Sequence, residues 1–294
     1  MITDVEAATP ALCRLQLGSE LRQLRLAAGL KGAQVVKKLI WSPSKLTRLE
    51  TGENSVVEPA DVMALCAMYG ADPETLGRLR SYAAVTKTKR DWWLSPEYRP
   101  VMTPGFKAFL DLEASATVLH TYETEFVPGL LQTEAYIRVI HQRAHQGLVP
   151  ELIDKLVAVR TTRQEVLSRP EAPLKYVAII NESVLRRKVG EPPVMRDQLT
   201  HIVNVVESRP NVRVQVVPFH AGAHPGMNGT FFVLQFPEML SLKPMVYLEN
   251  LVDAVVKRTD ADVERYAEAF SDLQALAPGP QESLSMIKEA IKEH

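Results

Sequence analysis

The segment SPSKLTRLETGE, residues 42–53, constrains the fold more than any other part of the chain. Ser42 is a good N-cap because its hydroxyl can accept a hydrogen bond from the free N–H groups of a first helical turn. Pro43 suits the first helical position, where its missing N–H costs nothing. Gly52 is placed to end the helix in a left-handed conformation. So short a helix is not stable alone, and it must pack one face against a support.

The two faces of this helix differ in chemistry. At about 100° per residue, Leu46 and Leu49 fall on one face and predict the contact with the support. Ser44 and Arg48 fall nearly opposite the leucines, with Thr47 on one flank and Lys45 on the other. The leucines therefore anchor the helix, and the polar face is held out to solvent.

Apolar residues at helical spacing continue on both sides of this segment and predict five short helices between residues 17 and about 82. After residue 105, helical patterns alternate with β-branched and aromatic runs. We therefore divide the chain into a flexible leader (1–16), an all-α domain (17–85), a linker or docking segment (86–104) and a larger domain (105–294). Trp92 and Trp93, in the docking segment, are predicted to pack at a domain junction.

The larger domain is predicted to have an α+β fold with a mainly antiparallel sheet. Predicted strands are 117–122, 175–180, 212–218, 230–235 and 245–248. Predicted helices are 106–115, 131–143, 150–168, 194–208, 260–276 and 281–292. The Gly-containing loop HAGAHPGMNG separates two of the strands and predicts a hairpin with a long connection.

Composition excludes several classes of protein. A chain of 294 residues with 46% hydrophobic content can bury two cores, and its net charge of −1 does not suit a general polyanion binder. Residues 17–53 nevertheless hold seven Lys or Arg against three Glu, which is a local basic patch. The two cysteines, Cys13 and Cys66, predict reduced core residues of a cytoplasmic protein. We expect no signal peptide and no membrane span.

The sequence LGSELRQLRLAAGLKGAQVVKKLIWSPSKLTRLETGE, residues 17–53, resembles the helix-turn-helix of phage-repressor-type (XRE) regulators. The resemblance implies a lambda-repressor-like domain of five helices, with residues 43–51 as the recognition helix in the major groove of double-stranded DNA. It also implies a nucleoid-associated protein. The residues implied to face DNA are Gln34, Ser42, Pro43, Ser44, Lys45, Thr47 and Arg48.

Chemistry assigns different roles within that group. The Arg48 guanidinium can donate two hydrogen bonds to guanine and is the candidate base reader, although a surface ion pair is the alternative. Ser44 and Thr47 can contact bases or phosphates, whereas Lys45 and Gln34 suit phosphates.

Three positions depart from the pattern of the family. Ile40 stands where a turn glycine is usual, so either the turn bends differently or this β-branched residue is strained. Lys31 replaces the usual cap of the second helix. Pro43 replaces a frequent glutamine, which removes one base contact.

The larger domain resembles the DUF5753 domain of actinobacterial WhiJ-type regulators. The resemblance rests on five stretches of sequence, which are ETEFVPGLLQTEAYIRVI, VLRRKVG, QLTHIV, VQVVPFHAGAHPGMNGTFFVLQF and MVYLEN. It implies an effector domain and, as a direct partner, a small DUF397 (BldB-like) protein.

Residues of the larger domain give candidates for a site but no catalytic constellation. His141 and His145 are spaced for a metal, but no third ligand is nearby, so we expect no metal and no cofactor. The candidate effector pocket comprises His220, His224, Tyr122 and Glu249, with a solvated loop as the alternative for the two histidines.

Three functional hypotheses follow. The favoured one is a DNA-binding regulator, not an enzyme, whose larger domain senses a small molecule or binds a partner protein. The others are an enzyme with a hydrolase-like pocket near residues 219–229, fused to a DNA-binding module, and a scaffolding protein. One short helix reads few bases, so the regulator is predicted to be a homodimer on two half-sites.

Overall fold

The computed structural model describes residues 10–54, 56–88, 91–170, 173–238, 243–251 and 253–294. The chain forms two compact units. The first contains the described residues up to Ser95, together with Leu110–Ser115 and the described part of Phe236–Lys243. The second contains Pro96–Phe109, Ala116–Gln235 and Pro244–His294.

The first unit is helical, as its sequence predicts. Its helices are α1 (Pro10–Ala27), α2 (Gly32–Leu39), α3 (Pro43–Thr51), α4 (Pro59–Tyr69) and α5 (Pro73–Thr88), followed by the 3₁₀ turn η1 (Trp92–Leu94). One buried cluster joins all five helices and includes Leu17, Val35, Leu49, Leu65 and Leu79. The apolar stripes that predict the helices therefore meet in a single core.

The start of α1 differs from the predicted leader. The helix begins at Pro10, inside the segment 1–16, and residues 1–9 lie outside the described part of the chain. Cys13 is fully buried, and the Arg14 guanidinium pairs with Asp91 at 3.0 Å. Packing against the rest of the unit therefore orders a segment whose sequence alone shows a weak helical stripe.

The second unit is built on a six-stranded sheet within the described residues, with strand order β3-β2-β1-β4-β5-β6. The strands are β1 (Val118–Glu123), β2 (Lys175–Asn181), β3 (Val212–Val217), β4 (Phe231–Gln235), β5 (Met245–Glu249) and β6 (Ala254–Lys257). β1, β2 and β3 pair in parallel, and β4, β5 and β6 continue the sheet antiparallel from β1.

The sheet is therefore mixed, and the prediction of a mainly antiparallel sheet is wrong. Helices connect β1 to β2 and β2 to β3, and such crossovers bring successive strands back in the same direction. The predicted hairpin between 212–218 and 230–235 is also wrong, since β2 and β1 lie between β3 and β4.

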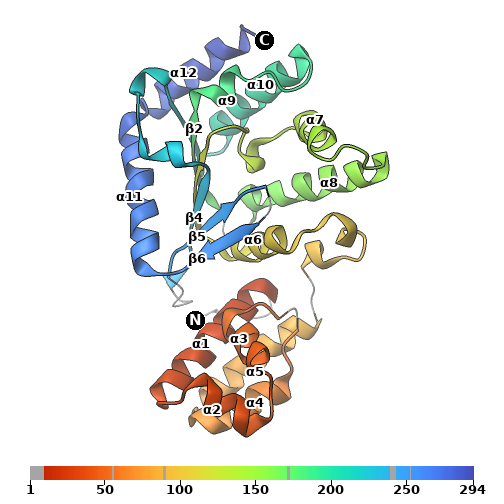
Figure 1. The fold of residues 1–294 in the computed structure, drawn as a ribbon, viewed down its shortest axis with the longest axis vertical. Helices are drawn as coiled ribbons and strands as arrows, with labels where there is room; N and C mark the ends of the chain where they lie inside the picture. Colours follow the sequence, from red (N-terminus) through yellow and green to blue (C-terminus); the bar gives the residue numbers. More distant parts are fainter. Residues whose placement is uncertain (1–9, 55, 89–90, 171–172, 239–242, 252) are drawn as a thin grey trace. The chain divides into compact units, whose positions relative to one another are not determined.

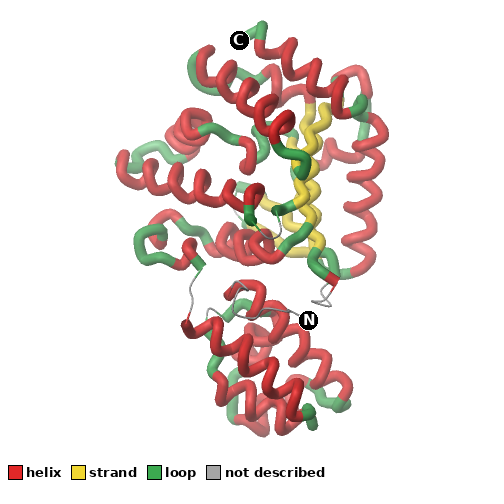
Figure 2. Tube along the Cα trace, turned by 180° about the vertical axis from the view of Figure 1, so that it is seen from behind, coloured by secondary structure: helices red, strands yellow, loops and turns green. Residues whose placement is uncertain are grey.

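Helices cover both faces of this sheet (Figures 1 and 2). Helix α11 packs on one face, where Phe270 stacks on His120 and Tyr266 contacts Phe231. The other face meets α6, where Phe109 contacts Phe232 and Tyr247. The longer helices of the unit are α7 (Glu134–Ala144), α8 (Pro150–Arg163), α10 (Pro192–Ser208), α11 (Asp260–Leu276) and α12 (Pro280–Ile291), and α6 (Pro104–Ser115) contributes its residues 104–109.

Short elements complete the unit. They are α9 (Glu182–Arg186) and the 3₁₀ turns η2 (Arg99–Val101), η3 (Gly129–Leu131), η4 (Gln164–Ser168), η5 (Phe219–Ala221) and η6 (Pro225–Asn228). Among the described residues, no helix combines the length and the hydrophobicity that a membrane span requires.

Candidate nucleic-acid interface and ligand pocket

Helix α3 forms as the sequence predicts. The Ser42 hydroxyl accepts a hydrogen bond from the Lys45 N–H at 3.3 Å, and Pro43 occupies the first turn. Gly52 ends the helix at φ 74° and donates its N–H to the carbonyl oxygens of Arg48 and Leu49. The N-cap and the C-cap are thereby confirmed.

The apolar face of α3 is buried, and its polar face is open to solvent. Leu46 and Leu49 are 5% and 1% exposed, whereas Ser44, Thr47 and Arg48 are exposed. Within the described part of the chain, no side chain pairs with the Arg48 guanidinium. This cation is therefore free to meet an external acceptor.

The hydroxyl groups at the start of α3 make few hydrogen bonds within the protein. Thr47 donates to the Pro43 carbonyl oxygen at 3.1 Å, and the Ser42 and Ser44 hydroxyls lie 3.1 Å apart. Ser42 and Pro43 are both exposed at the start of the helix. These groups remain accessible beside Arg48.

Lys45 and Gln34 are placed differently from Arg48. The Lys45 ammonium pairs with Asp61 at 2.8 Å and lies 3.9 Å from the centroid of the Trp41 ring. The Gln34 side-chain oxygen accepts from the Lys31 N–H at 2.7 Å, which caps α2. Both side chains therefore have intramolecular roles that the sequence pattern does not reveal.

Two contacts fix α3 on its support. Arg25 of α1 donates to both carboxylate oxygens of Glu50, at 2.6 Å and 2.8 Å, and also to the Leu30 carbonyl oxygen. This side-chain hydrogen bond to Glu50 raises the pKa of Arg25. Gly18 of α1 lies so close to α3 that a Cβ there would stand 2.4 Å from the Leu49 carbonyl oxygen.

The turn before α3 holds a strained residue. Ile40 ends α2 in the left-handed region at φ 57° and ψ 44°, and it is 93% exposed. Among the described residues it is the one non-glycine with a positive φ. The turn therefore keeps the backbone that a glycine would give, and of the two outcomes predicted for Ile40 the structure shows the strained one.

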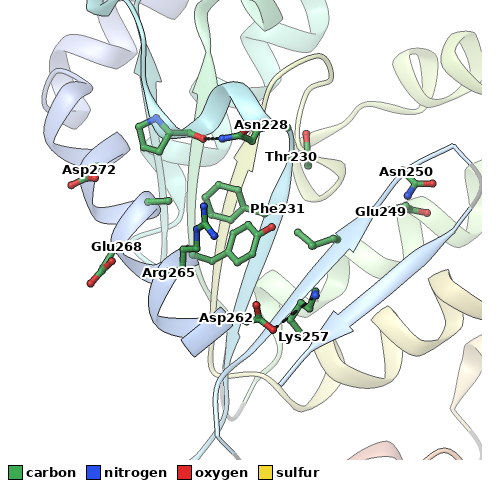
Figure 3. A pocket seen from close by; sticks show the side chains of 15 residues that line it. Asn228, Thr230, Phe231, Glu249, Asn250, Lys257, Asp262, Arg265, Glu268 and Asp272 are labelled. Atoms are coloured by element: carbon green, nitrogen blue, oxygen red, sulfur yellow. Dashed lines mark hydrogen bonds and ion pairs between the residues drawn. The ribbon is translucent and has the colours of Figure 1, made fainter. Parts of the chain in front are cut away.

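Cavities lie on both faces of the sheet in the second unit. The loop cavity, of about 730 Å³, lies beside η6 and α11 (Figure 3). Figure 3 shows Phe231 and Arg265 near its centre and Glu268 and Asp272 at its outer side. Lys257 and Asp262 form a 3.9 Å ion pair in its wall.

The aromatic–arginine pocket, of about 270 Å³, lies on the opposite face. It is lined by Phe106, Phe109, Glu123, Phe126, Gly129, Gln132, Ile140, His141, Ala144, His145, Arg160, Arg163, Phe232, Tyr247 and Glu249. Its walls come from α6, α7, α8 and the strand ends. It brings two guanidiniums, two carboxyl groups and five aromatic rings into one small space.

A buried carboxyl group lies between the two cavities. Glu123, which ends β1, is 7% exposed and accepts a hydrogen bond from the Thr230 hydroxyl at 3.0 Å. Burial raises the pKa of Glu123 to about 8, and the charge of Glu249 adds to this effect, while Thr230 and Arg163 oppose it. The carboxyl group is therefore mainly protonated at neutral pH.

A second buried titratable group lines the aromatic–arginine pocket. His141 is 8% exposed, its ring stacks on His145 with centroids 5.7 Å apart, and its Nε2 atom has no hydrogen-bond partner among the described residues. Burial, followed by the charge of Arg160, lowers the pKa of His141 to about 4. Its imidazole is therefore neutral at neutral pH.

The four residues of the predicted effector pocket are not all brought together. Tyr122 and His224 meet edge to face with ring centroids 6.0 Å apart, but the described linings of the two cavities include neither of them. His220 is exposed on η5. Glu249 lines both cavities.

Sequence reasoning missed Glu123, Arg160 and Arg163. The predicted strand stops at Tyr122, one residue before Glu123, and the two arginines read as ordinary residues of a long helix. A lone carboxyl group at the end of an otherwise apolar strand is the signal that would have indicated the site. Among the described residues, no group of three or more His, Cys, Asp or Glu is placed to hold a metal ion.

These features define a helix-turn-helix protein with a separate mixed-sheet domain. Residues 16–87 match the family model described as a helix-turn-helix domain, and residues 106–289 match the model described as a domain of unknown function, DUF5753. The second match spans more than half of the chain, so the chain belongs to the DUF5753 family.

The helix-turn-helix domain supports a DNA-binding regulator, and the predicted presence of a helix-turn-helix domain and of a DUF5753 domain is confirmed. The WhiJ-type and actinobacterial attributions stay predictions. No curated protein and no solved structure matches the chain.

Proposed function

We propose that this protein is a transcriptional regulator that binds double-stranded DNA sequence-selectively through α3. The observation that carries the proposal is the exposed Arg48 guanidinium on a helix whose opposite face is buried. A guanidinium held on a rigid support can form two hydrogen bonds with guanine, which discriminate against other bases. Binding of DNA would place the working protein at the nucleoid in the cytoplasm.

The larger domain, in this proposal, changes the affinity for the operator when it binds an effector. Its two cavities support a small molecule as that effector, because concave sites lined by aromatic rings and a few polar groups suit such ligands. A small DUF397-type protein is the alternative effector. Either one acts through its different affinities for two states of the regulator.

We assign binding, not catalysis, to the aromatic–arginine pocket. The described lining of the aromatic–arginine pocket contains no Ser, Thr, Cys or Lys side chain that could act as an acyl-transfer nucleophile. Glu123 and Glu249 favour the enzyme alternative, since a pair of carboxyl groups in one pocket can act as acid and base. Turnover of an ester or a glycoside that is lost in Glu123→Gln would support the enzyme.

The proposal is tested by selecting preferred sequences from random DNA with the full chain and measuring binding by fluorescence anisotropy. We expect Arg48→Ala to lower the preference for the selected site over random DNA by about tenfold, since one bidentate contact contributes about 1–3 kcal/mol. Arg80→Ala, an exposed arginine of α5, is the matched control and should leave the preference unchanged. An unchanged preference in Arg48→Ala would refute the assignment of α3.

A further inference from the structure

The aromatic–arginine pocket has a preorganised cationic wall. The Arg160 guanidinium lies 4.0 Å from the centroid of the Phe106 ring, and the Arg163 guanidinium lies 4.8 Å from that of Phe109. Stacking on a ring holds a guanidinium in one plane, and its edge keeps N–H donors in a fork that matches a carboxylate. Helix α8 therefore presents two oriented cations to this small space.

One buried polar atom of the pocket is without a hydrogen bond in the described protein. It is Nε2 of His141, a residue that is 8% exposed. Buried polar groups normally have partners, and leaving one unsatisfied costs free energy. A polar ligand in the pocket would supply this partner.

Cationic side chains line the wall of the pocket. Arg160 and Arg163 lie in it with Glu249 and Glu123, and Glu123 is mainly uncharged at neutral pH because burial raises its pKa. His141 is neutral, because burial lowers its pKa. The aromatic rings of Phe109, Phe232 and Tyr247 pack within 6 Å of one another and form an apolar wall beside the charges.

We propose that the aromatic–arginine pocket binds a small molecule that combines a planar apolar ring with a carboxylate. The carboxylate lies against the Arg160 and Arg163 guanidiniums, and the ring lies against Phe109, Phe232 and Tyr247. The cavity of about 270 Å³ suits a small metabolite rather than a peptide. This inference rests on the proposed function only for its meaning as an effector site, since the pocket exists whether or not α3 binds DNA.

The test uses the full chain without DNA and three probes of the same shape. They are 2-naphthoate, its neutral amide 2-naphthamide, and the cation 2-naphthylmethylammonium, each titrated by calorimetry at pH 7. We expect 2-naphthoate to bind at least about tenfold more tightly than either analogue, because hydrogen bonds between ionised groups are the stronger kind. Equal affinity for the amide, tighter binding of the cation, or no saturable binding of 2-naphthoate would overturn the proposal.

Substitutions of a pocket residue test whether 2-naphthoate binds in this pocket. Arg160→Gln should weaken 2-naphthoate binding by about tenfold and leave 2-naphthamide nearly unchanged, and Arg160→Lys, which keeps the charge, should fall between. Arg196→Gln, an exposed arginine of α10, is the matched control and should bind like the parent chain. Circular dichroism checks that each variant is folded, and a folded Arg160→Gln that retains full 2-naphthoate affinity would refute the site.

A pH series supplies a second readout. Raising the pH from 7 to 9 ionises Glu123 and adds a negative charge that faces Arg160, Arg163, Glu249 and Tyr136. The affinity for 2-naphthoate should therefore fall by several-fold in the parent chain and stay level in Glu123→Gln. A parallel fall in both would contradict the placement of the carboxylate beside Glu123.

Failure of this inference and failure of the proposed function give different results. If 2-naphthoate binds as expected but Arg48→Ala leaves DNA selectivity unchanged, the proposed ligand class is supported and the assignment of α3 is wrong. If Arg48→Ala lowers DNA selectivity but 2-naphthoate binds no better than its amide, the proposed DNA recognition is supported and the ligand class is wrong.

Discussion

At the scale of single residues, Ile40 strains the turn between α2 and α3, at a position where the helix-turn-helix pattern usually has a glycine. Ile40 keeps a left-handed backbone that costs a residue with a Cβ atom about 1–2 kcal/mol, and its exposed side chain gains little from packing. We expect Ile40→Gly to raise the free energy of unfolding by about 1 kcal/mol. Ile40→Ala, which keeps a Cβ atom, should gain much less.

Tryptophan fluorescence can measure this effect. All three tryptophans, at positions 41, 92 and 93, belong to the first unit, so urea unfolding followed by their emission reports that unit. If Ile40→Gly is less stable than the parent chain, the turn is not strained in solution. If it is more stable but binds DNA less well, the exposed isoleucine contributes to the interface.

The buried Glu123 carboxyl group predicts a pH dependence of stability. Its pKa is about 8 in the folded protein and 4.5 ordinarily, so between these values the folded chain holds a proton that the unfolded chain has released. The free energy of unfolding therefore falls as the pH rises through this window. Below about pH 6.5 the lowered pKa of His141 acts in the opposite direction, because the unfolded histidine then binds the extra proton.

Between pH 6.5 and 8, the pH dependence of the free energy of unfolding therefore reports mainly Glu123 and not His141. The free energy of unfolding of the second unit should fall there by about 2 kcal/mol more in the parent chain than in Glu123→Gln. Thr230→Val removes a hydrogen bond that favours the ionised carboxylate and so raises the pKa of Glu123 further. The fall in the free energy of unfolding should therefore extend to higher pH. Unfolding followed by circular dichroism at each pH measures both effects, and identical profiles for Glu123→Gln and the parent would contradict the assignment.

The exposure of some residues predicted to face DNA could be foreseen from the sequence, and the contacts of others could not. Ser44, Thr47 and Arg48 are exposed because the helical period sets them away from Leu46 and Leu49. The pairing of Lys45 with Asp61 depends on how α3 and α4 pack, which no local pattern records.

At the scale of secondary-structure elements, the contact between α1 and α3 depends on a glycine. A Cβ atom at Gly18 would lie 2.4 Å from the Leu49 carbonyl oxygen, so α1 and α3 would have to move apart. We expect Gly18→Ala to destabilise the first unit by about 1–3 kcal/mol and to weaken DNA binding. Tryptophan fluorescence and anisotropy measure the two effects.

Gly77 of α5 provides the matched control for the same substitution. A Cβ atom there would meet nothing within 4 Å, so Gly77→Ala should stabilise the unit by about 0.5–1 kcal/mol through helix propensity alone. Equal effects at the two positions would show that the close approach of α1 and α3 is relaxed in solution.

Most elements of the second unit could be predicted from sequence, but their arrangement could not. Periodicity identifies β1 to β5 to within two residues, whereas β6, with four residues, is too short to show alternation. Strand order depends on which strands the helices α7 to α10 bring side by side. The aromatic–arginine pocket could not be predicted for the same reason, because Glu123, Arg160 and Tyr247 come from segments that are distant in the sequence.

At the scale of the whole molecule, the charge distribution and the shortness of α3 together predict a dimer on DNA. The chain has a net charge of −1, so in the proposed function the basic patch of residues 17–53 attracts DNA, and one such patch neutralises few phosphates. Two copies on one operator double both the phosphate contacts and the bases read. Half-sites are then expected about 34 Å apart, which is one turn of the double helix.

This prediction is tested by footprinting on a selected operator and by native mass spectrometry of the complex. We expect two protected half-sites related by a two-fold axis and a complex that contains two chains. Lengthening the operator by about five base pairs between the half-sites turns one to the opposite side of the DNA and should abolish cooperative binding. Full affinity on the lengthened site, or one chain on a single half-site, would show that each helix-turn-helix acts alone, and the effector domain would then have to act within a monomer.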